Sequence, residues 1–302
     1  MMGAFAWPGF GRDSLFRDWS ISSQPTLLDT MDSRETICWQ DHSGEFTVSK
    51  VRSASRPHYH RVRLGAAIAV DIMSDRRLVT AMAPGIPQFT LDHFLADQVI
   101  PRALAHEGSF VVHAGAVQID EAVMLVMGRS GSGKSTLSTS FDQSGFALLG
   151  DDAMIVSLVD DAYCASAVYP SLRLLPDSID ALFPNSIGST AVAHYSAKRC
   201  VSLPLAQSDD ARPLPIRAIF VLAEPAGDGR IGLDRLTEKK ACMAFIANSF
   251  ALDPSDTARA SDRLAISSSL ARLIPTLEIA YPRDYARLPE VRSAILSEIE
   301  GL

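Results

Sequence analysis

The chain has 302 residues, with 28 Lys and Arg against 35 Asp and Glu, so its formal net charge is −7. This acidic balance argues against nonspecific affinity for nucleic acid or for anionic membranes. Hydrophobic residues make up 47% of the chain, as in an ordinary globular protein, and the length suits one large domain or two modest ones.

The cysteines and the amino terminus bear on the cellular compartment. Cys38, Cys164, Cys200 and Cys242 are scattered, with no CxxC pair and no metal-ligand spacing, so we interpret them as reduced thiols of a cytoplasmic protein. Residues 1–19 lack the uninterrupted apolar core of a signal peptide. No apolar segment approaches the roughly 20 residues that a membrane span needs.

Residues 1–86 are expected to form a small β-rich amino-terminal domain. Apolar and β-branched runs separated by Gly, Ser and polar turns predict an antiparallel sheet with strands at 36–39, 45–48, 66–70 and 77–82. Residues 56–63 are locally basic; a solvated strand face is the expected interpretation, and a nucleic-acid or peptide-binding strip is the alternative. The sequence Pro84-Gly85-Ile86-Pro87 marks the boundary with a second domain, 87–302.

The second domain is expected to begin with a helix. Thr90 can cap this helix, Pro101 should kink or break it, and Gly108 should end it. Residues 109–117 predict a strand, and the polar turn Asp120-Glu121 should connect this strand as a hairpin to the apolar run 122–127.

A glycine-rich loop with the spacing G-x-x-x-x-G-K-[ST] follows the apolar run, and a helix from about Lys134 to Phe141 follows the loop. This is a P-loop in its strand–loop–helix context, which a Gly/Ser linker would not need. Glycines let backbone N–H groups approach phosphate oxygens, and the helix N-terminus adds partial positive charge. We expect Lys134 to reach the β- and γ-phosphates and to face solvent while the site is empty, and Ser135 to bind Mg²⁺. The residues expected to bind the nucleotide are Gly128, Arg129, Ser130, Gly131, Ser132, Gly133, Lys134, Ser135 and Thr136.

Two aspartates and a histidine are the candidate catalytic side chains near this loop. Asp151 and Asp152 end the next apolar run, where P-loop enzymes usually handle Mg²⁺ and the nucleophile. Adjacent buried carboxylates repel each other and need a metal or cations nearby, whereas a solvated turn is the alternative. His113 should lie on the strand beside the loop, and a satisfied core histidine is its alternative interpretation.

The remaining elements follow in chain order. Strands are expected at 153–158, 198–203, 216–222 and 277–281, and residues 184–196 are expected to be a loop. Helices are expected at 177–183, at 237–249 with Thr237 as its cap, from Asp256 or Thr257 to Leu273, and at 288–299.

Three stretches, 112–117, 128–136 and 145–152, together resemble the HPr kinase/phosphorylase family. The similarity is greatest to the HPr-kinase-like serine kinases of bacterial peptide-modification gene clusters, including those for lasso peptides. It covers about residues 90–175, and the order and spacing of the histidine, the P-loop and the paired aspartates carry it. The resemblance implies an α/β fold: a P-loop kinase domain of HPr kinase/phosphoenolpyruvate carboxykinase type with a mixed sheet, preceded by the small β-rich domain.

The resemblance also implies roles for the site residues. Asp151 would accept the proton of the attacking hydroxyl, and Asp152 would help Ser135 hold Mg²⁺, with the order of these two roles left open. His113 would hydrogen-bond near the transferring phosphate or the base. The E-I-R-G-x-G signature of true HPr kinase/phosphorylases is absent, because the corresponding residues 169–174 read Y-P-S-L-R-L. Phosphorylase activity and HPr as the substrate are therefore in doubt.

Three cations downstream, Arg173, Lys198 and Arg199, are candidates for contacting the phosphate or the acceptor, with surface ion pairs as the alternative. The expected function is that of an ATP- and Mg²⁺-dependent kinase of a hydroxyl, foremost a serine of a peptide or protein such as a lasso precursor. The rivals are a small-molecule alcohol kinase and a nucleotide-binding regulatory module with little turnover. Carboxykinase-like decarboxylation would need further metal ligands. No nucleic-acid or membrane partner is expected, and the sequence leaves open whether the chain forms a homo-oligomer.

Overall fold

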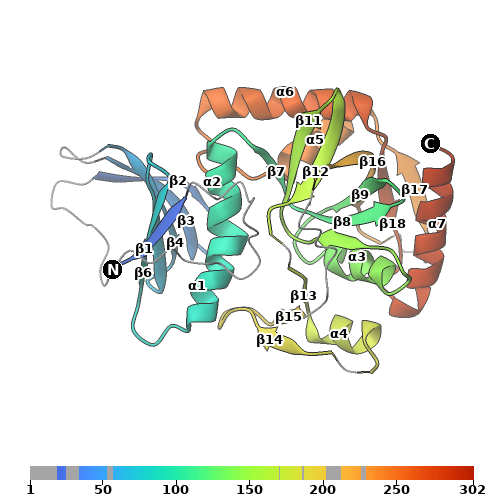
Figure 1. Ribbon diagram of the computed structural model, residues 1–302, viewed down its shortest axis with the longest axis horizontal. Coiled ribbons are helices and arrows are strands. Elements are labelled where there is room, and N and C mark those ends of the chain that lie inside the picture. Colours follow the sequence, from blue (N-terminus) through green and yellow to red (C-terminus); the bar gives the residue numbers. More distant parts are fainter. Residues whose placement is uncertain are drawn as a thin grey trace. The chain divides into compact units, whose positions relative to one another are not determined.

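The structure is a computed structural model that describes residues 19–24, 34–52, 57–169, 171–185, 187–201, 212–225 and 229–302. The chain divides into two compact units (Figure 1). Unit 1 comprises Met1–Gly108, Ala193–Ser196 and Ala251–Ala260, and unit 2 comprises Ser109–Val192, Ala197–Phe250 and Ser261–Leu302. The domain boundary expected after residue 86 stays a prediction. Within the described residues, no helix combines the length and apolar character that crossing a membrane requires.

Unit 1 is built on a sheet to which six of its described strands belong. These strands are β1 (Ser20–Ser23), β2 (Arg34–Gln40), β3 (Phe46–Arg52), β4 (Tyr59–Leu64), β5 (Ile68–Ile72) and β6 (Arg77–Met82). They lie side by side in the order β1-β6-β5-β4-β3-β2. Neighbours from β2 to β6 are antiparallel, as predicted, whereas β1 runs parallel to β6. Strand β1 went unpredicted because three of its four residues are serines.

Strand β4 is buried, which corrects the solvated face expected for this basic stretch. The Arg61 side chain is only 1% exposed and lies directly opposite Asp71 of β5. Its Nε donates to Asp71 Oδ1 at 2.6 Å and its Nη2 donates to Oδ2 at 2.9 Å. A bidentate carboxylate partner offsets the cost of removing a guanidinium from water, so a basic residue can occupy the core.

The helical stretch of unit 1 continues through its proline. Helix α1 (Gln88–Phe94), a π-helical turn (Leu95–Val99) and α2 (Ile100–His106) follow one another directly. The wide turn lies just before Pro101, which has no N–H to donate, so the helix passes the proline without ending. Thr90 does not cap α1, contrary to expectation. It lies buried within the helix, and its Oγ1 accepts a hydrogen bond from the His194 backbone N–H at 3.2 Å.

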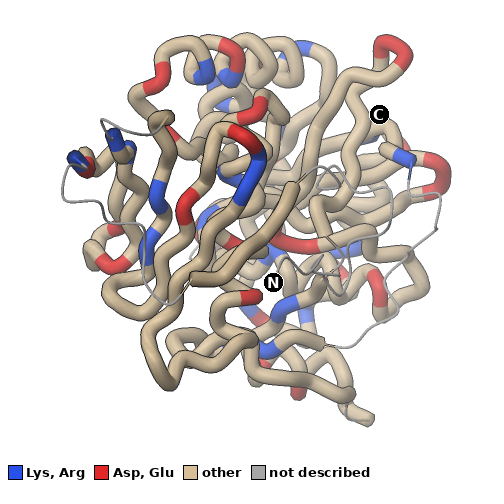
Figure 2. Tube along the Cα trace, turned by 60° about the vertical axis from the view of Figure 1, so that its left-hand side comes forward, with Lys and Arg blue, Asp and Glu red and all other residues tan. Residues whose placement is uncertain are grey.

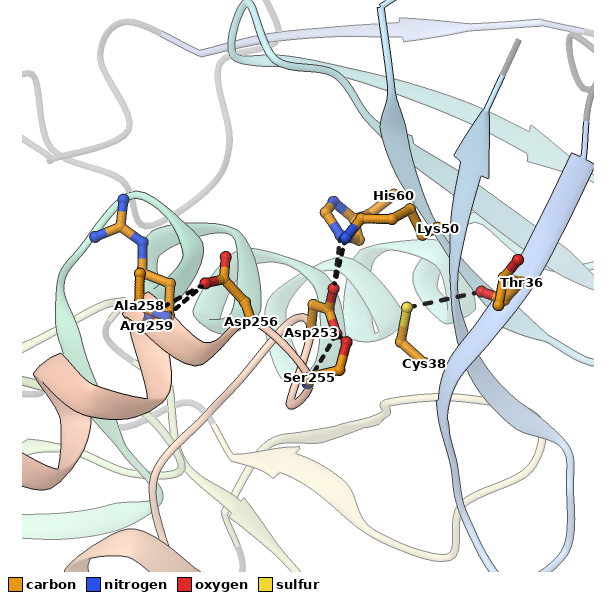
Figure 3. A network of polar contacts seen from close by, with 9 residues as sticks. All are labelled: Thr36, Cys38, Lys50, His60, Asp253, Ser255, Asp256, Ala258 and Arg259. Carbon is orange, nitrogen blue, oxygen red and sulfur yellow. Dashed lines mark hydrogen bonds and ion pairs between the residues drawn. The ribbon is translucent and has the colours of Figure 1, made fainter.

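The segment Ala251–Ala260 joins unit 1 from far along the chain, and a polar network holds it there (Figure 3). Asp253 Oδ2 accepts a hydrogen bond from Lys50 Nζ at 3.0 Å and lies 3.8 Å from His60 Nε2. The His60 ring packs edge-on against the His106 ring, with centroids 4.8 Å apart.

Unit 2 contains a mixed sheet to which nine of its described strands belong. These are β7 (Phe110–Val112), β8 (Ala114–Ile119), β9 (Ala122–Met127), β10 (Leu148–Gly150), β11 (Met154–Val159), β12 (Ala162–Ala167), β16 (Leu214–Leu222), β17 (Gly232–Arg235) and β18 (Thr276–Ala280). The main path is β10-β8-β9-β16-β12-β11-β7, and β18 joins β16 with β17 at its side. Strands β9, β16 and β18 are parallel while the other pairs are antiparallel, so the chain is a mixed α/β protein.

A second, three-stranded sheet in unit 2 has the order β13-β15-β14 among the described residues. Its strands are β13 (Arg173–Leu174), β14 (Ser189–Ala191) and β15 (Arg199–Val201). Strand β14 falls within residues 184–196, which the sequence predicts as a loop. Part of the strand expected at 198–203 lies outside the described residues.

The helices of unit 2 match most of the expected ones. They are α3 (Lys134–Asp142), α4 (Pro176–Leu182), α5 (Glu238–Ala247) and α7 (Leu288–Glu300), with a short 3₁₀ turn at Tyr285–Arg287. Helix α6 (Thr257–Leu273) begins in the segment assigned to unit 1. Thr237 caps α5 by accepting a hydrogen bond from Lys240 N–H, as predicted, and Asp256 accepts the N–H groups of the first turn of α6.

Strand β9 is buried on both faces, which explains its continuous apolar sequence. Met124 and Val126 belong to one apolar cluster with residues of α3 and α7. Val123, Leu125 and Met127 belong to a second cluster with residues of α5 and α6. The loop that follows β9 therefore begins at a rigid position.

Candidate functional site

The glycine-rich loop lies between β9 and α3, so the predicted strand–loop–helix order is confirmed. Gly128 has φ 149°, and a Cβ there would come within 2.8 Å of Ser132 Oγ and 3.1 Å of Leu222 Cβ. Gly133, which precedes α3, has φ 97°. Side chains at these two positions would be strained, so the motif's glycines are required by the backbone.

Lys134 is buried, which corrects the expectation that it faces solvent. The residue is 4% exposed, and its Nζ donates to the carbonyl oxygens of Gly128 at 2.9 Å and Arg129 at 3.0 Å. An ammonium group has three donors and no acceptor, so it binds the carbonyl oxygens of the loop itself. The rest of the loop ranges from exposed, at Arg129, Ser130 and Gly131, to half-buried, at Ser132, Gly133, Ser135 and Thr136.

His113 occupies the single position between β7 and β8, where the chain changes its strand partner. Strand β7 pairs with β11, whereas β8 pairs with β9, which leads into the loop. The backbone N–H of His113 donates to Asn248 O at 2.7 Å, and its Nε2 lies 3.3 Å from Asp152 Oδ1. The histidine is therefore directed at the aspartate pair.

Asp152 is surrounded by the side chains of Arg173, His113 and Lys198. Arg173 Nη1 lies 3.2 Å from Oδ2, while His113 Nε2 and Lys198 Nζ lie 3.3 Å and 3.9 Å from Oδ1. Burial raises the pKa of Asp152, but the His113 hydrogen bond and the charges of Arg173 and Lys198 together lower it well below its ordinary value. This carboxylate is thus held ionised.

Asp151 is fully buried, and within the described part of the chain neither of its carboxylate oxygens accepts a hydrogen bond of standard geometry, although the Ser135 side chain acts as a weak donor to it. Burial first, and then the charge of Asp152, raise the pKa of Asp151, while Lys198, Ser135 and Lys134 oppose this shift. A buried carboxylate without a hydrogen bond of standard geometry is costly and marks a candidate functional group.

Close packing brings α3, the helix after the glycine-rich loop, near this carboxylate. A Cβ on Gly115 of β8 would collide with Ser138 Oγ of α3 and would lie 3.5 Å from Asp151 Oδ1. Ser138 Oγ is likewise buried without a hydrogen-bond partner among the described residues. Carboxylate and hydroxyl oxygens are ligands that suit Mg²⁺, and the side chains of Ser135, Asp151 and Asp152 fit such an ion by their chemistry. The described residues hold no group of three or more His, Cys, Asp or Glu arranged for a metal.

Two arginines lie apart from the aspartate pair. Arg199 donates to Ser189 Oγ and Ser189 O, both at 2.8 Å, across the small sheet, and its expected contact with phosphate or acceptor stays a prediction. Arg283 was missed, although its Nη1 donates to Gly131 O in the loop at 2.9 Å. Arg283 lies in a polar stretch after a strand, which reads as an ordinary turn and gives no signal for a site.

Comparison with known proteins adds little to what the geometry of the site shows. No protein-family model and no curated protein sequence matches this chain. A solved structure, the HPr(Ser) kinase/phosphatase from Coxiella burnetii, is similar over 63% of this chain and 98% of its own chain, with 14% sequence identity and a TM-score of 0.32. Similarity at that level does not establish a shared fold or activity.

Proposed function

We propose that this chain is an ATP- and Mg²⁺-dependent phosphotransferase that phosphorylates a hydroxyl group, foremost a serine of a peptide or protein. The observation that carries the proposal is Asp151, a fully buried carboxylate that accepts no hydrogen bond of standard geometry from the described residues. Lys134 and Ser135 of the glycine-rich loop act on Asp151, because both oppose the rise of its pKa. The G-x-x-x-x-G-K-S sequence supports a triphosphate as the ligand of that loop.

The loop residues would bind and orient the nucleotide. Backbone N–H groups from Gly128 to Thr136 would bind phosphate oxygens, and Lys134 would exchange its carbonyl partners for the β- and γ-phosphates. Ser135 would hold Mg²⁺ together with Asp152, which must then release one of its cationic partners. When bound, the ion supplies neutralisation of phosphate charge.

Asp151 would remove the proton from the acceptor hydroxyl. As the acceptor oxygen forms its bond to the γ-phosphorus, the bond from that phosphorus to the bridging oxygen breaks and its electron pair leaves with the diphosphate. A carboxylate whose pKa is raised is a better proton acceptor than an ordinary aspartate. Arg173, Lys198 and His113, gathered on Asp152, would stabilise the negative charge of the transferring group.

The Asp151→Asn variant tests the proposal. We expect phosphate incorporation into a library of serine-containing peptides, measured by mass spectrometry with ATP and Mg²⁺, to fall by about 10²–10⁴. ATP affinity, measured by calorimetry, should change little. Asp180→Asn, at an exposed position of α4, is the matched control and should behave as the wild type.

The Asp152→Asn variant separates the two aspartate roles. We expect it to weaken Mg²⁺ dependence and nucleotide affinity together. The opposite pattern, in which Asp151→Asn loses binding and Asp152→Asn loses only turnover, would assign the roles in reverse. A wild-type chain that binds ATP but transfers no phosphate would favour the regulatory module, and unchanged turnover in both variants would refute a catalytic pair.

A further inference from the structure

The residues that follow β18, Tyr281 to Tyr285, contact the glycine-rich loop from a side that the proposed chemistry does not use. Arg283 Nη1 donates to Gly131 O at 2.9 Å. The Tyr281 hydroxyl is 3.4 Å from the position that a Cβ on Gly133 would take. Two side chains of one short segment, which bends at Arg283, thus meet the same loop.

A chain of hydroxyl groups extends this contact to the first turn of α3. Thr136 Oγ1 lies 3.0 Å from Ser178 Oγ, and Ser178 Oγ lies 3.1 Å from the Tyr285 hydroxyl. The Tyr285 hydroxyl donates to Asp177 Oδ2 at 2.9 Å. The segment is therefore fixed against the loop at its start and at its end.

The sheet order places this segment and the aspartate pair on opposite sides of β9. At the end of β9 that leads into the loop, β9 pairs with the start of β8, which follows His113, and β8 in turn pairs with β10, which precedes Asp151. Strands β16 and β18, which lead to Arg283, lie on the other side of β9. If the γ-phosphate lies at the aspartates, a nucleotide that spans the loop has its α-phosphate and nucleoside on the β18 side, where Arg283 contacts Gly131.

Within the described residues, the hydrogen bonds that hold the Arg283 guanidinium run through its edges. Nη1 donates to Gly131 O, and Nη2 lies 3.4 Å from Glu224 Oε2. Both contacts use N–H groups, which lie in the guanidinium plane, and the side chain is 47% exposed. A planar, partly exposed cation that is fixed at its edges is suited to stacking on an aromatic ring.

We propose that Arg283 binds the nucleoside by stacking its guanidinium on the purine base, with the segment Tyr281 to Tyr285 forming the wall beside it. This inference rests on the proposed function, because it needs a nucleotide in the loop. It assigns the base to the β18 side of the site and gives Arg283 a role in nucleotide recognition that the phosphate motif does not supply.

The test compares ATP with inorganic tripolyphosphate, which has the phosphates but no nucleoside. In Arg283→Ala, we expect ATP affinity measured by calorimetry with Mg²⁺ to fall about two- to thirty-fold, the range of a cation–π contact. Tripolyphosphate affinity should stay at the wild-type value. Arg283→Lys should resemble the alanine variant, because an ammonium keeps the charge but lacks the planar face.

Arg287→Ala is the matched control. Arg287 is 33% exposed and contacts Glu290 and Gly229 O instead of the loop, so both affinities should be unchanged. Equal losses of ATP and tripolyphosphate in Arg283→Ala would make Arg283 a support of the loop and overturn the inference. Full ATP affinity in Arg283→Lys would overturn it as well. Failure of the wild type to bind either ligand would instead refute the proposed nucleotide site itself, and the inference with it.

Discussion

Asp152 illustrates how much a single buried carboxylate depends on its neighbours. It adopts φ 71°, an uncommon conformation for a residue with a side chain, and its oxygens face Arg173, His113 and Lys198. Backbone strain and charge burial at one residue are typical of functional sites. The arginine matters most for stability, because it is itself buried.

Arg173→Gln should destabilise unit 2. Removing one member of a buried ion pair costs about 3–5 kcal/mol when the other charge is left uncompensated, and the nearby Lys198 should keep the loss below that range. Because the folded-state pKa of Asp152 is lowered, its contribution is present above the ordinary aspartate pKa of about 3.9 and is lost as the pH falls below that value. Urea unfolding should therefore show the full difference between variant and wild type at pH 7, and this difference should begin to shrink as the pH falls below about 3.9.

Arg199→Gln is the control for this measurement, since Arg199 contacts Ser189 and not the aspartates. A destabilisation of Arg173→Gln no larger than that of Arg199→Gln would contradict the role given to the ion pair.

Lys134→Ala should abolish nearly all phosphate transfer and should also lower stability. The buried ammonium donates to two loop carbonyls, and losing such partners costs about 1–3 kcal/mol for each group left unsatisfied. Phosphate transfer and thermal unfolding should be measured on the same preparation. Equal turnover by variant and wild type would refute the nucleotide site, whereas unchanged stability would show that the carbonyls find other partners.

At the scale of elements, the ion pair between β4 and β5 gives a clear expectation. Asp71→Asn should cost about 3–5 kcal/mol of unfolding free energy, because Arg61 would stay buried beside a neutral group. The double variant Arg61→Met/Asp71→Leu should recover most of that loss. Denaturant unfolding of Arg61→Met, of Asp71→Leu and of the double variant measures the coupling between the two side chains. Strict additivity of the two changes would contradict it.

The exposed pair Arg63–Glu35 provides the comparison. Its nitrogen and oxygen are 3.2 Å apart, and both side chains are partly exposed, so Arg63→Met should cost about 1 kcal/mol or less.

The sequence predicts elements best where one residue class dominates. The apolar run of β9 and the spacing of Val291, Ile295 and Ile299 in α7 identify both elements, and the glycine spacing identifies the loop between β9 and α3. Strands β12 and β17 were missed, because A-Y-C-A-S-A and G-L-D-R lack the alternation or length of a typical strand.

The sequence likewise predicts the candidate site only where a recognisable spacing identifies its residues. Motif spacing points to Lys134, Ser135, Asp151 and Asp152, because these residues are close in sequence to the loop or to each other. It cannot point to Arg283, which is 152 residues from its partner Gly131. Nor does it show that Lys134 is buried, since that depends on where the loop's carbonyl oxygens point.

At the scale of the whole chain, acid should destabilise unit 1 through its histidine pair. Burial and the charge of His106 lower the pKa of His60 to about 4, and burial lowers that of His106. The other charged groups that act on the two histidines are Lys50, Asp253, Asp256, Arg259 and Glu107. Unfolded histidine takes up protons near pH 6.5, so stability should be full above that pH and should fall as the pH drops toward 4.

Thermal unfolding of the full chain between pH 8 and pH 4 checks this expectation. His60→Gln should flatten the profile in that range. Asp253, whose pKa is lowered chiefly by Ser255 and Lys50 against the effect of burial, loses its contribution only below the ordinary aspartate pKa, so the two effects occupy separate pH ranges. A profile that is flat from pH 8 to pH 4 would contradict the histidine assignment.

Acidic and basic residues are interspersed along the described trace (Figure 2). Truncation is a direct test of organisation. A chain beginning at residue 87 keeps α1 and α2 but loses β3, whose Phe46 ring lies 5.9 Å from that of Phe94. Because Phe94, Val99 and Ile100 are fully buried, we expect this chain to aggregate more than one beginning at residue 109.

Light scattering of the two truncated chains at equal concentration decides between boundaries at 86 and 108. Greater solubility of the longer chain would favour the boundary expected from the sequence.

The segment that carries Asp253 has a consequence for biosynthesis. Lys50 and Asp253, which form one contact of unit 1, are separated by 203 positions in the chain. At a translation rate of about 5–20 residues per second, the carboxylate leaves the ribosome about 10–40 s after the lysine that binds it. The first 108 residues are therefore synthesised well before the segment Ala251–Ala260 that completes unit 1. Unit 1 must finish folding after most of unit 2 has been made.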